Sequence, residues 1–223
     1  MSNNNKLKKY IALVGILFLF PLLWILIFGV GAKHNFNTLK YFEPGSDQPL
    51  DSSSYTIPDF SFKDENGQVF TLDSMRGKIC MAAFYDLGDD HIKDITDRLL
   101  TINFKYRSEP DIVIVVFSTN SDSDRLKDLK SYVESNVRYN DFPNKWKYLT
   151  GEPGEMDKYL KEGFFIDDIS KEARFRLIDP RGGIRGMYGN TEFHLQIAKD
   201  DIAILKKELD KKAYNERKAK EKK

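Results

Sequence analysis

The feature that most constrains this chain is a run of 23 consecutive uncharged residues, Tyr10 to Ala32, close to its N-terminus. As a helix rising about 1.5 Å per residue, the run would reach about 34 Å, enough to cross a hydrocarbon core of about 30 Å. Pro21 would kink such a helix without preventing it from spanning. A cleaved signal peptide usually has a shorter apolar stretch and a small-residue cleavage site. We therefore expect an uncleaved transmembrane anchor over residues 10–32.

The charges that flank this run predict its orientation. Lys6, Lys8 and Lys9 precede it, whereas only Lys33 and His34 follow closely. The positive-inside rule then places residues 1–9 in the cytoplasm and everything after the anchor on the other side. We expect a single-pass protein of the cytoplasmic (inner) membrane whose C-terminal domain lies on the periplasmic or extracytoplasmic side.

The rest of the chain divides by composition into a linker, a domain and a tail. Residues 33–54 are polar and contain Pro44, Gly45 and Pro49, which predicts a linker before a domain over residues 55–210. Residues 211–223 form a basic C-terminal tail, and nine Lys or Arg stand against four Asp or Glu from Lys206 to Lys223. We expect a solvated end of a last helix, with a membrane-surface or nucleic-acid contact as the alternative. A net charge of only +1 argues against nucleic acid as a partner of the whole chain.

Hydrophobic periodicity predicts an α/β fold with a mixed sheet. Helical spacing of apolar residues indicates helices over 92–102, 122–137, 153–161 and 195–209. Turn signals at Asn66-Gly67 and at Asp179-Pro-Arg-Gly-Gly183 predict two hairpins. Alternating or continuous apolar runs indicate strands at 57–62, 68–72, 79–85, 111–118, 145–149, 174–178 and 184–188. Strands that alternate with helices before a final hairpin and helix are typical of a single α/β domain.

The only cysteine is Cys80, inside a predicted strand. One cysteine excludes an intramolecular disulfide, a dithiol redox pair and a Cys-rich zinc or iron–sulfur site within one chain. We expect Cys80 to be a small buried residue without reactivity. His194 opens the last predicted helix, where a surface or capping role is expected. Gly182-Gly183 is too short for a phosphate loop and fits a hairpin turn.

Several motifs resemble known thioredoxin-like proteins. The start of the domain resembles the peroxiredoxin and Sco/SenC type, through Ile57-Pro-Asp-Phe-Ser-Phe62, Asn66-Gly67, Gly77-Lys78 and Phe84-Tyr85. The later part resembles the Sco/SenC family in particular, through Trp146-Lys-Tyr-Leu-Thr-Gly151 and Phe175-Arg-Leu-Ile-Asp-Pro-Arg-Gly-Gly-Ile-Arg-Gly-Met-Tyr188. The resemblance covers about residues 55–209. It implies a thioredoxin-like mixed sheet flanked by helices, which here would be preceded by one transmembrane helix.

The resemblance also implies a chemistry whose ligands this sequence lacks. Sco proteins deliver copper to cytochrome c oxidase, or reduce the thiols that receive it, with a Cys-x-x-x-Cys motif and a histidine. Thiolates select Cu(I), and an imidazole also accommodates Cu(II). Ungapped alignment puts the two cysteine positions at Asp89 and Lys93, and the histidine within 167–171, which contains none. The three copper ligands are therefore absent from the expected positions.

One histidine lies between the two lost cysteine positions. His91 follows Asp86, Asp89 and Asp90, and an Asp/His loop is able to bind a hard divalent ion. The alternative is that these acidic residues cap the N-terminus of the next helix. Lys93 would oppose a cation. We expect no catalytic residue, no bound metal and no other cofactor, with His91, Asp89 and Asp90 as the candidates should a metal be bound, copper included.

These observations lead to a ranked set of functions. The first is a non-catalytic, membrane-anchored assembly or docking factor related to the biogenesis of the cytochrome c oxidase copper centre. Its expected partners are the membrane and either respiratory-oxidase subunits or a ligand-bearing Sco paralogue. The second is residual metal handling through the His91 loop. The third is a thiol oxidoreductase or peroxiredoxin-like enzyme, which a single misplaced thiol opposes.

Overall fold

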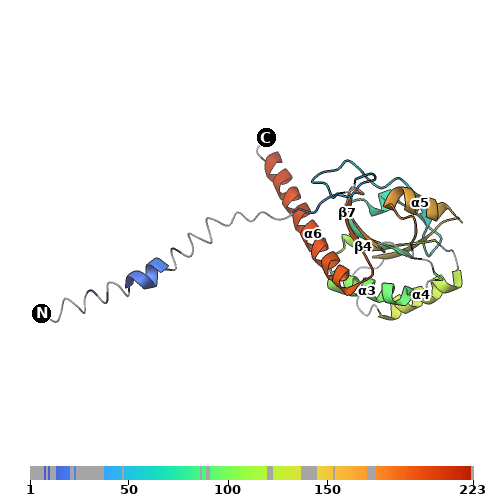
Figure 1. Cartoon of the computed structure of the whole chain (residues 1–223), viewed down its shortest axis with the longest axis horizontal. Coiled ribbons are helices and arrows are strands. Elements are labelled where there is room, and N and C mark those ends of the chain that lie inside the picture. Colours follow the sequence, from blue (N-terminus) through green and yellow to red (C-terminus); the bar gives the residue numbers. More distant parts are fainter. Residues whose placement is uncertain are drawn as a thin grey trace. The chain divides into compact units, whose positions relative to one another are not determined.

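The computed structural model describes residues 8, 10, 14–20, 23, 38–46, 48–85, 87–88, 91–119, 123–136, 145–152, 154–169 and 174–221. The chain divides into two units, Met1–Asn37 and Thr38–Lys223, which are described separately (Figure 1). In the first unit, residues 14–20 are helical. Most of the predicted anchor, 10–32, lies outside the described residues. Among those that are described, no helix is both long and apolar enough to cross a membrane.

A seven-stranded mixed sheet forms the centre of the second unit, in the order β2-β1-β5-β4-β3-β6-β7. The middle strands β3, β4 and β5 are parallel, and the remaining pairs are antiparallel. All side chains of β3 and β4 are buried, because helices cover both faces of the sheet. The strands are Ser61–Lys63 (β1), Val69–Thr71 (β2), Ile79–Tyr85 (β3), Ile112–Ser118 (β4), Trp146–Thr150 (β5), Phe175–Ile178 (β6) and Ile184–Tyr188 (β7).

Helices pack on both faces and enclose two separate cores (Figure 1). One core lies between the sheet and the apolar sides of α3 and α6, with α4 beside them. The other lies under α5 and the short α2 and is rich in aromatic rings. The helices are Leu72–Met75 (α2), Ile92–Lys105 (α3), Ser123–Asn136 (α4), Glu155–Phe164 (α5) and Glu192–Lys220 (α6). This arrangement confirms the predicted α/β class, a mixed sheet flanked by helices.

The first hairpin has the predicted turn but shorter strands. Gly67, with φ 75°, closes the turn between β1 and β2. The predicted strand from residue 57 begins only at Ser61, because the Ile57 amide donates to the carbonyl of Gly182 and Pro58 has no amide hydrogen. The Asp64 side chain accepts the amides of Asn66 and Gln68, both at 2.9 Å, and holds the turn from inside.

A buried ion pair stabilises the same hairpin. Lys147 Nζ lies 2.9 Å from Asp64 Oδ2 and 3.4 Å from Glu65 Oε1. Burial acts to raise the pKa of the Asp64 carboxyl, but the hydrogen bonds from Lys147 and from two backbone amides outweigh it. The pKa of Asp64 is therefore held below its ordinary value. The ion pair joins the tip of the β1–β2 hairpin to the central strand β5.

Two predicted helix ends lie elsewhere in the structure. The helix predicted over 153–161 is α5, which follows Gly154 and continues to Phe164. It ends at Phe165 in a left-handed conformation (φ 59°), and the Ile166 amide closes the end on the Leu160 carbonyl. The last helix continues through the predicted tail to Lys220. Neither Gly nor Pro occurs after Gly189 to stop it.

Residues 38–46 and 48–50 of the predicted linker lie against the domain, and the segment 38–50 is here named the strap. Backbone bridges join Tyr41 to Leu50 within the strap and Phe42 to Ile184 of β7. The polar composition predicted a linker, but the strap's backbone groups find partners on the domain. The compact unit that contains the sheet begins at Thr38 and therefore includes the strap.

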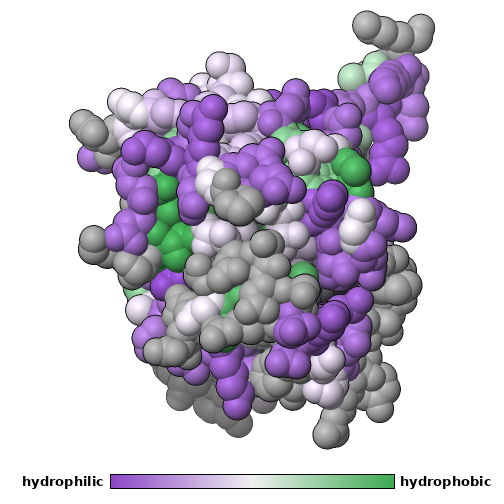
Figure 2. Space-filling view, turned by 90° about the vertical axis from the view of Figure 1, so that its right-hand side faces the viewer, coloured by the Kyte–Doolittle hydropathy of each residue, from purple (hydrophilic) through white to green (hydrophobic). Residues whose placement is uncertain are grey.

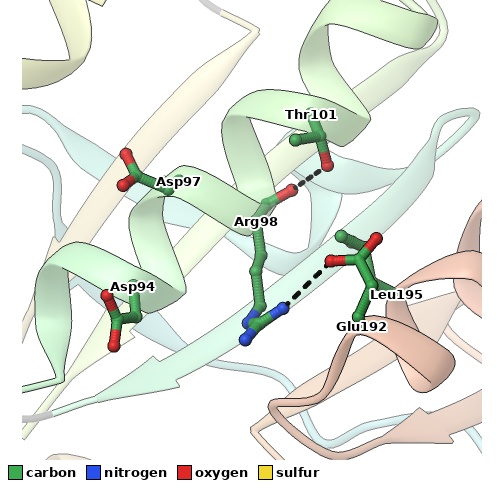
Figure 3. A pocket seen from close by; sticks show the side chains of 6 residues that line it. All are labelled: Asp94, Asp97, Arg98, Thr101, Glu192 and Leu195. Atoms are coloured by element: carbon green, nitrogen blue, oxygen red, sulfur yellow. Dashed lines mark hydrogen bonds and ion pairs between the residues drawn. The ribbon is translucent and has the colours of Figure 1, made fainter.

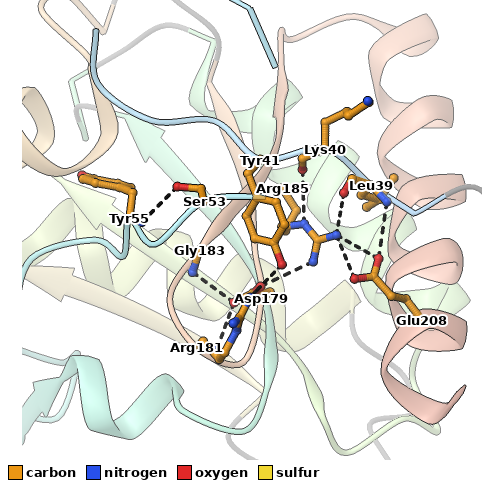
Figure 4. A network of polar contacts seen from close by, with 10 residues as sticks. All are labelled: Leu39, Lys40, Tyr41, Ser53, Tyr55, Asp179, Arg181, Gly183, Arg185 and Glu208. Carbon is orange, nitrogen blue, oxygen red and sulfur yellow. Dashed lines mark hydrogen bonds and ion pairs between the residues drawn. The ribbon is translucent and has the colours of Figure 1, made fainter. Parts of the chain in front are cut away.

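Arg185 holds the strap in place from β7 (Figure 4). Its buried guanidinium donates to the carbonyls of Leu39 (2.6 Å) and Lys40 (3.2 Å) and lies over the Tyr41 ring, 4.1 Å from the centroid. It also pairs with Asp179 (3.4 Å) and Glu208 (2.8 Å). One side chain therefore connects the strap, the β6–β7 hairpin and α6.

Candidate functional site

The loop between β3 and α3 lies where α/β folds commonly bind ligands, at the carboxyl end of parallel strands. β3 ends at Tyr85, which pairs with Ser118 at the end of β4, and both side chains are buried. Burial raises the pKa of the Tyr85 hydroxyl well above its ordinary value, so it stays protonated at neutral pH. Leu87 is also buried, whereas Gly88 is exposed. Leu87 and Gly88 therefore offer no side chain that could act as a nucleophile or a metal ligand.

Cys80 lies far from this loop, as predicted. It is the second residue of β3 and fully buried, about 17 Å along the strand from Tyr85 at about 3.3 Å per residue. Its side chain belongs to the aromatic-rich core under α5, on the face of the sheet opposite α3. Burial raises the pKa of the thiol well above its ordinary value. The thiol is therefore neither exposed nor ionised near the candidate site.

His91 occupies the N-cap position of α3, and its carbonyl accepts the Ile95 amide. Its side chain is 71% exposed, and Nδ1 lies 3.9 Å from a carboxylate oxygen of Asp94, itself 67% exposed. The other two candidates, Asp89 and Asp90, lie outside the described residues, as does Asp86. The structure therefore brings His91 together with Asp94, a neighbour that the sequence reasoning did not single out.

The described donors around the loop do not fit the Cu(I) site that the resemblance implies. Of the two positions that the resemblance assigns to cysteines, Asp89 is not described and Lys93 is an exposed ammonium on the first turn of α3. In the segment 167–171, the exposed carboxylate of Asp167 lies 2.7 Å from Lys161 Nζ. Cu(I) selects thiolates, and a lysine repels a cation. Within the described part of the chain, no three His, Cys, Asp or Glu side chains are grouped to hold a metal ion.

His194 has the capping role expected of it. Its backbone amide donates to Thr191 Oγ1 (3.2 Å), the N-cap of α6. Its ring nitrogen Nδ1 accepts the Gly189 amide at 2.9 Å. Both contacts fix the turn from β7 into α6. His194 therefore has a structural role at the helix start.

A hollow of about 230 Å³ lies between the first three turns of α3 and the first turn of α6 (Figure 3). Arg98 Nη1 reaches Glu192 Oε2 at 3.3 Å across it, joining the two helices. Three carboxylates and one guanidinium give the lining a net negative charge. Sequence reasoning missed this group, because its halves lie 94 residues apart along the chain. The lining residues are Asp94, Asp97, Arg98, Thr101, Glu192 and Leu195.

Solved structures share this fold over nearly their whole length. A SCO1/SenC family lipoprotein from Bacillus anthracis aligns with a TM-score of 0.56 and 20% identity, over 68% of this chain and 95% of that one. Copper-bound yeast Sco1 aligns with a TM-score of 0.53 and 21% identity, over 68% and 92%. A putative protein disulfide isomerase from Bacteroides thetaiotaomicron aligns with 0.53 and 14%, over 76% and 95%. The chain therefore has a thioredoxin-like fold.

A sequence match narrows this class. The chain is 24% identical over 159 residues to the SCO1 protein homolog of Bacillus subtilis (strain 168), covering 66% of this chain and 81% of that protein. No protein-family model matches the sequence. The match to the SCO1 homolog, together with the shared fold, supports membership of the Sco/SenC family. Within that family's fold, this chain carries a single cysteine, buried away from the loop.

Proposed function

We propose that this protein is a membrane-anchored assembly or docking factor related to the biogenesis of the cytochrome c oxidase copper centre, and that it works without thiol or copper chemistry of its own. A solved relative by fold, BsSco, is described as a member of the Sco family of cytochrome c oxidase assembly proteins (TM-score 0.53, 21% identity). The proposal extends that association to this chain. The observation that carries it is the burial of Cys80 on the face opposite α3.

The absence of a redox cysteine pair from this fold favours a docking function over a catalytic one. Disulfide exchange requires an accessible thiolate, and a dithiol mechanism needs a second cysteine. The only thiol here is fully buried with a raised pKa. What remains is a rigid sheet that positions the loop before α3 and the hollow beside it. These surfaces are able to bind a partner without any reaction.

The proposal includes the anchor over residues 10–32. The uncharged run is long enough to span a bilayer, and the flanking lysines favour a cytoplasmic N-terminus. The domain would then lie on the periplasmic or extracytoplasmic side of the inner membrane. Its proposed partners there are respiratory-oxidase subunits or a Sco paralogue that carries the copper ligands.

The hollow between α3 and α6 is the docking contact that the geometry favours. Asp94, Asp97 and Glu192 surround it with carboxylates, and only Arg98 offsets them. A lysine or arginine of the partner would find complementary charge there. His91 Nδ1 lies 3.9 Å from Asp94, which lines the hollow, so a partner seated there would also lie near His91.

Genetic complementation tests the proposal. A strain that lacks the protein is expected to lose oxidase activity, and Cys80→Ala is expected to restore it fully. The double variant Asp94→Asn with Glu192→Gln is expected to restore much less. The matched control, Asp157→Asn with Glu162→Gln, removes two exposed carboxylates from α5 on the other side of the sheet and is expected to behave like the wild type. Loss of function with Cys80→Ala would contradict a thiol-independent role.

Metal handling by the His91 loop is tested separately. The full chain in detergent is titrated with Cu(I) and Cu(II) against a competing chelator, and retained metal is counted after gel filtration. We expect no retained ion, because the loop lacks thiolates and Lys93 opposes a cation. A stoichiometric ion that His91→Ala abolishes would refute the docking proposal in favour of metal handling.

A further inference from the structure

The C-terminal end of α6 extends beyond the core of its own domain. Residues Asp210 to Lys220 are all exposed, whereas Leu205 is buried and Leu209 still packs on the core. The exposed part continues the helix for about 16 Å. Figure 2 shows this end of α6 projecting from the domain with a mostly hydrophilic surface. Its side chains are thus accessible to something outside the domain.

The charge of this segment is opposite to that of the rest of the chain. From Asp210 to Lys220 five Lys or Arg stand against two Asp or Glu, a net charge of +3, and the rest of the chain is net negative because the whole chain is only +1. Lys211, Tyr214 and Lys218 are spaced by three and four residues and share one helix face. Lys218 Nζ lies 5.8 Å from the centroid of the Tyr214 ring, which is 58% exposed. Tyrosine and lysine are the side chains that favour a membrane–water interface.

The strap fixes where the chain enters the domain, and that place is beside α6. The Leu39 amide lies 3.4 Å from Glu208 Oε2. Arg185 Nη2 bridges the same two residues, at 2.6 Å from the Leu39 carbonyl and 2.8 Å from Glu208 Oε2 (Figure 4). The chain therefore enters the domain beside Glu208, two residues before the exposed end of α6 begins at Asp210.

Chain length then limits the distance from this point to the membrane. Six residue steps separate Ala32, the end of the proposed anchor, from Thr38, and they span at most about 22 Å. The helix from Glu208 to Lys220 reaches about 18 Å. Because this helix starts beside the entry point and is nearly as long as the whole connection, it can reach the lipid headgroups when it points toward the bilayer.

From this charge and this connectivity, we infer that the exposed C-terminal end of α6, Asp210 to Lys220, binds the anionic phospholipid surface next to the membrane anchor. The inference rests on the anchor in the proposed function, which brings the helix to the bilayer. Basic residues held at a lipid surface are attracted by anionic headgroups within about a Debye length. The contact would give the domain a second attachment and a fixed orientation relative to the bilayer.

A fluorophore on the helix tests this contact in the full chain. Asn215→Cys is labelled with a polarity-sensitive dye in a Cys80→Ala background, and the protein is reconstituted into vesicles. One set contains phosphatidylcholine alone, and the other equal parts phosphatidylcholine and phosphatidylglycerol. We expect a blue shift only in the second set, reversed by high salt. Lys211→Glu with Lys218→Glu is expected to cut the fraction in contact at least about tenfold. Lys63→Glu with Lys158→Glu, the same charge change on other exposed surfaces, is expected to have little effect.

Flotation and the dye shift together distinguish failure of the helix contact from failure of the anchor. Flotation of the phosphatidylcholine vesicles in high salt reports on the anchor alone. A chain that stays on these vesicles but shows no blue shift on anionic ones would overturn the helix contact and leave the anchor intact. A chain that leaves these vesicles would overturn both. An equal shift on both lipid compositions would refute recognition of anionic headgroups. A blue shift of the dye with added polyglutamate, but none with phosphatidylglycerol vesicles, would show that the helix binds an acidic protein instead of the lipid surface.

Discussion

Arg185→Met provides the sharpest test of how the domain is held together. The side chain is buried, and the variant keeps most of its volume while removing the guanidinium. It would break the ion pairs to Asp179 and Glu208 and both hydrogen bonds to the strap. Asp179 would remain buried without its main cation.

The structure sets the expected magnitude. Removing one partner of a buried ion pair costs about 3–5 kcal/mol. Asp179 Oδ1 keeps the amides of Arg181 (2.9 Å) and Gly183 (3.0 Å), so the lower end, about 3 kcal/mol, applies. For a domain of this size, that loss lowers Tm by about 6–12 °C.

Urea unfolding of the full chain in detergent micelles, followed by circular dichroism, measures the loss. The matched control is Arg181→Met on the same hairpin, whose side chain is 60% exposed and whose removal should cost less than about 1 kcal/mol. Hydrogen exchange should also accelerate at the amide of Tyr41, which donates to the Leu50 carbonyl, and at the amide of Phe42, which donates to the Ile184 carbonyl of β7. An Arg185→Met protein as stable as Arg181→Met would refute the view that this cation holds the strap.

Three further predictions concern single residues. Gly186→Ala should destabilise the domain by more than about 2 kcal/mol in urea, because a Cβ there would overlap the Tyr188 ring, whose hydroxyl donates to Asp201 at 2.8 Å; a near-neutral effect would contradict this packing. Asp64→Asn should weaken the dependence of the free energy of unfolding on pH in the acid range. The lowered pKa of Asp64 gives the wild type stability that is present above the ordinary carboxyl pKa of 3.8 and lost as pH falls through the lower folded value; identical acid transitions would exclude this role. Cys80→Ala should leave the far-ultraviolet spectrum unchanged and cost only about 1–2 kcal/mol for the small cavity, whereas failure to fold would show a larger packing role.

Much of the fold was predictable because it depends on local patterns. The continuous apolar run of β4, the helical spacing of Ile92, Ile95 and Leu99, and the Asn66-Gly67 turn each specify one element. The strap was not predictable, since its contacts depend on Arg185, about 145 residues further along the chain. Its own composition indicates only a polar segment.

The candidate site likewise has features that local sequence patterns predict and features that depend on contacts between distant residues. The burial of Cys80 followed from its place within an apolar strand, and the capping role of His194 from its place at a helix start. The hollow lined by Arg98 and Glu192 depends on how two helices pack, which no local pattern reports. The only sequence signal there was the acid–base spacing of Asp94 and Arg98, which is common on exposed helix faces.

Arg185 has a consequence for the solubility of the domain. It belongs to β7, the last strand in the sheet order, and an edge strand is where a sheet can add strands from other molecules. The buried charge of Arg185 on this edge strand disfavours pairing with a strand of another molecule. The strap also occupies part of the edge, because Phe42 already forms a backbone bridge with Ile184. Molecules in which the strap is released should therefore be the ones that aggregate through their sheets.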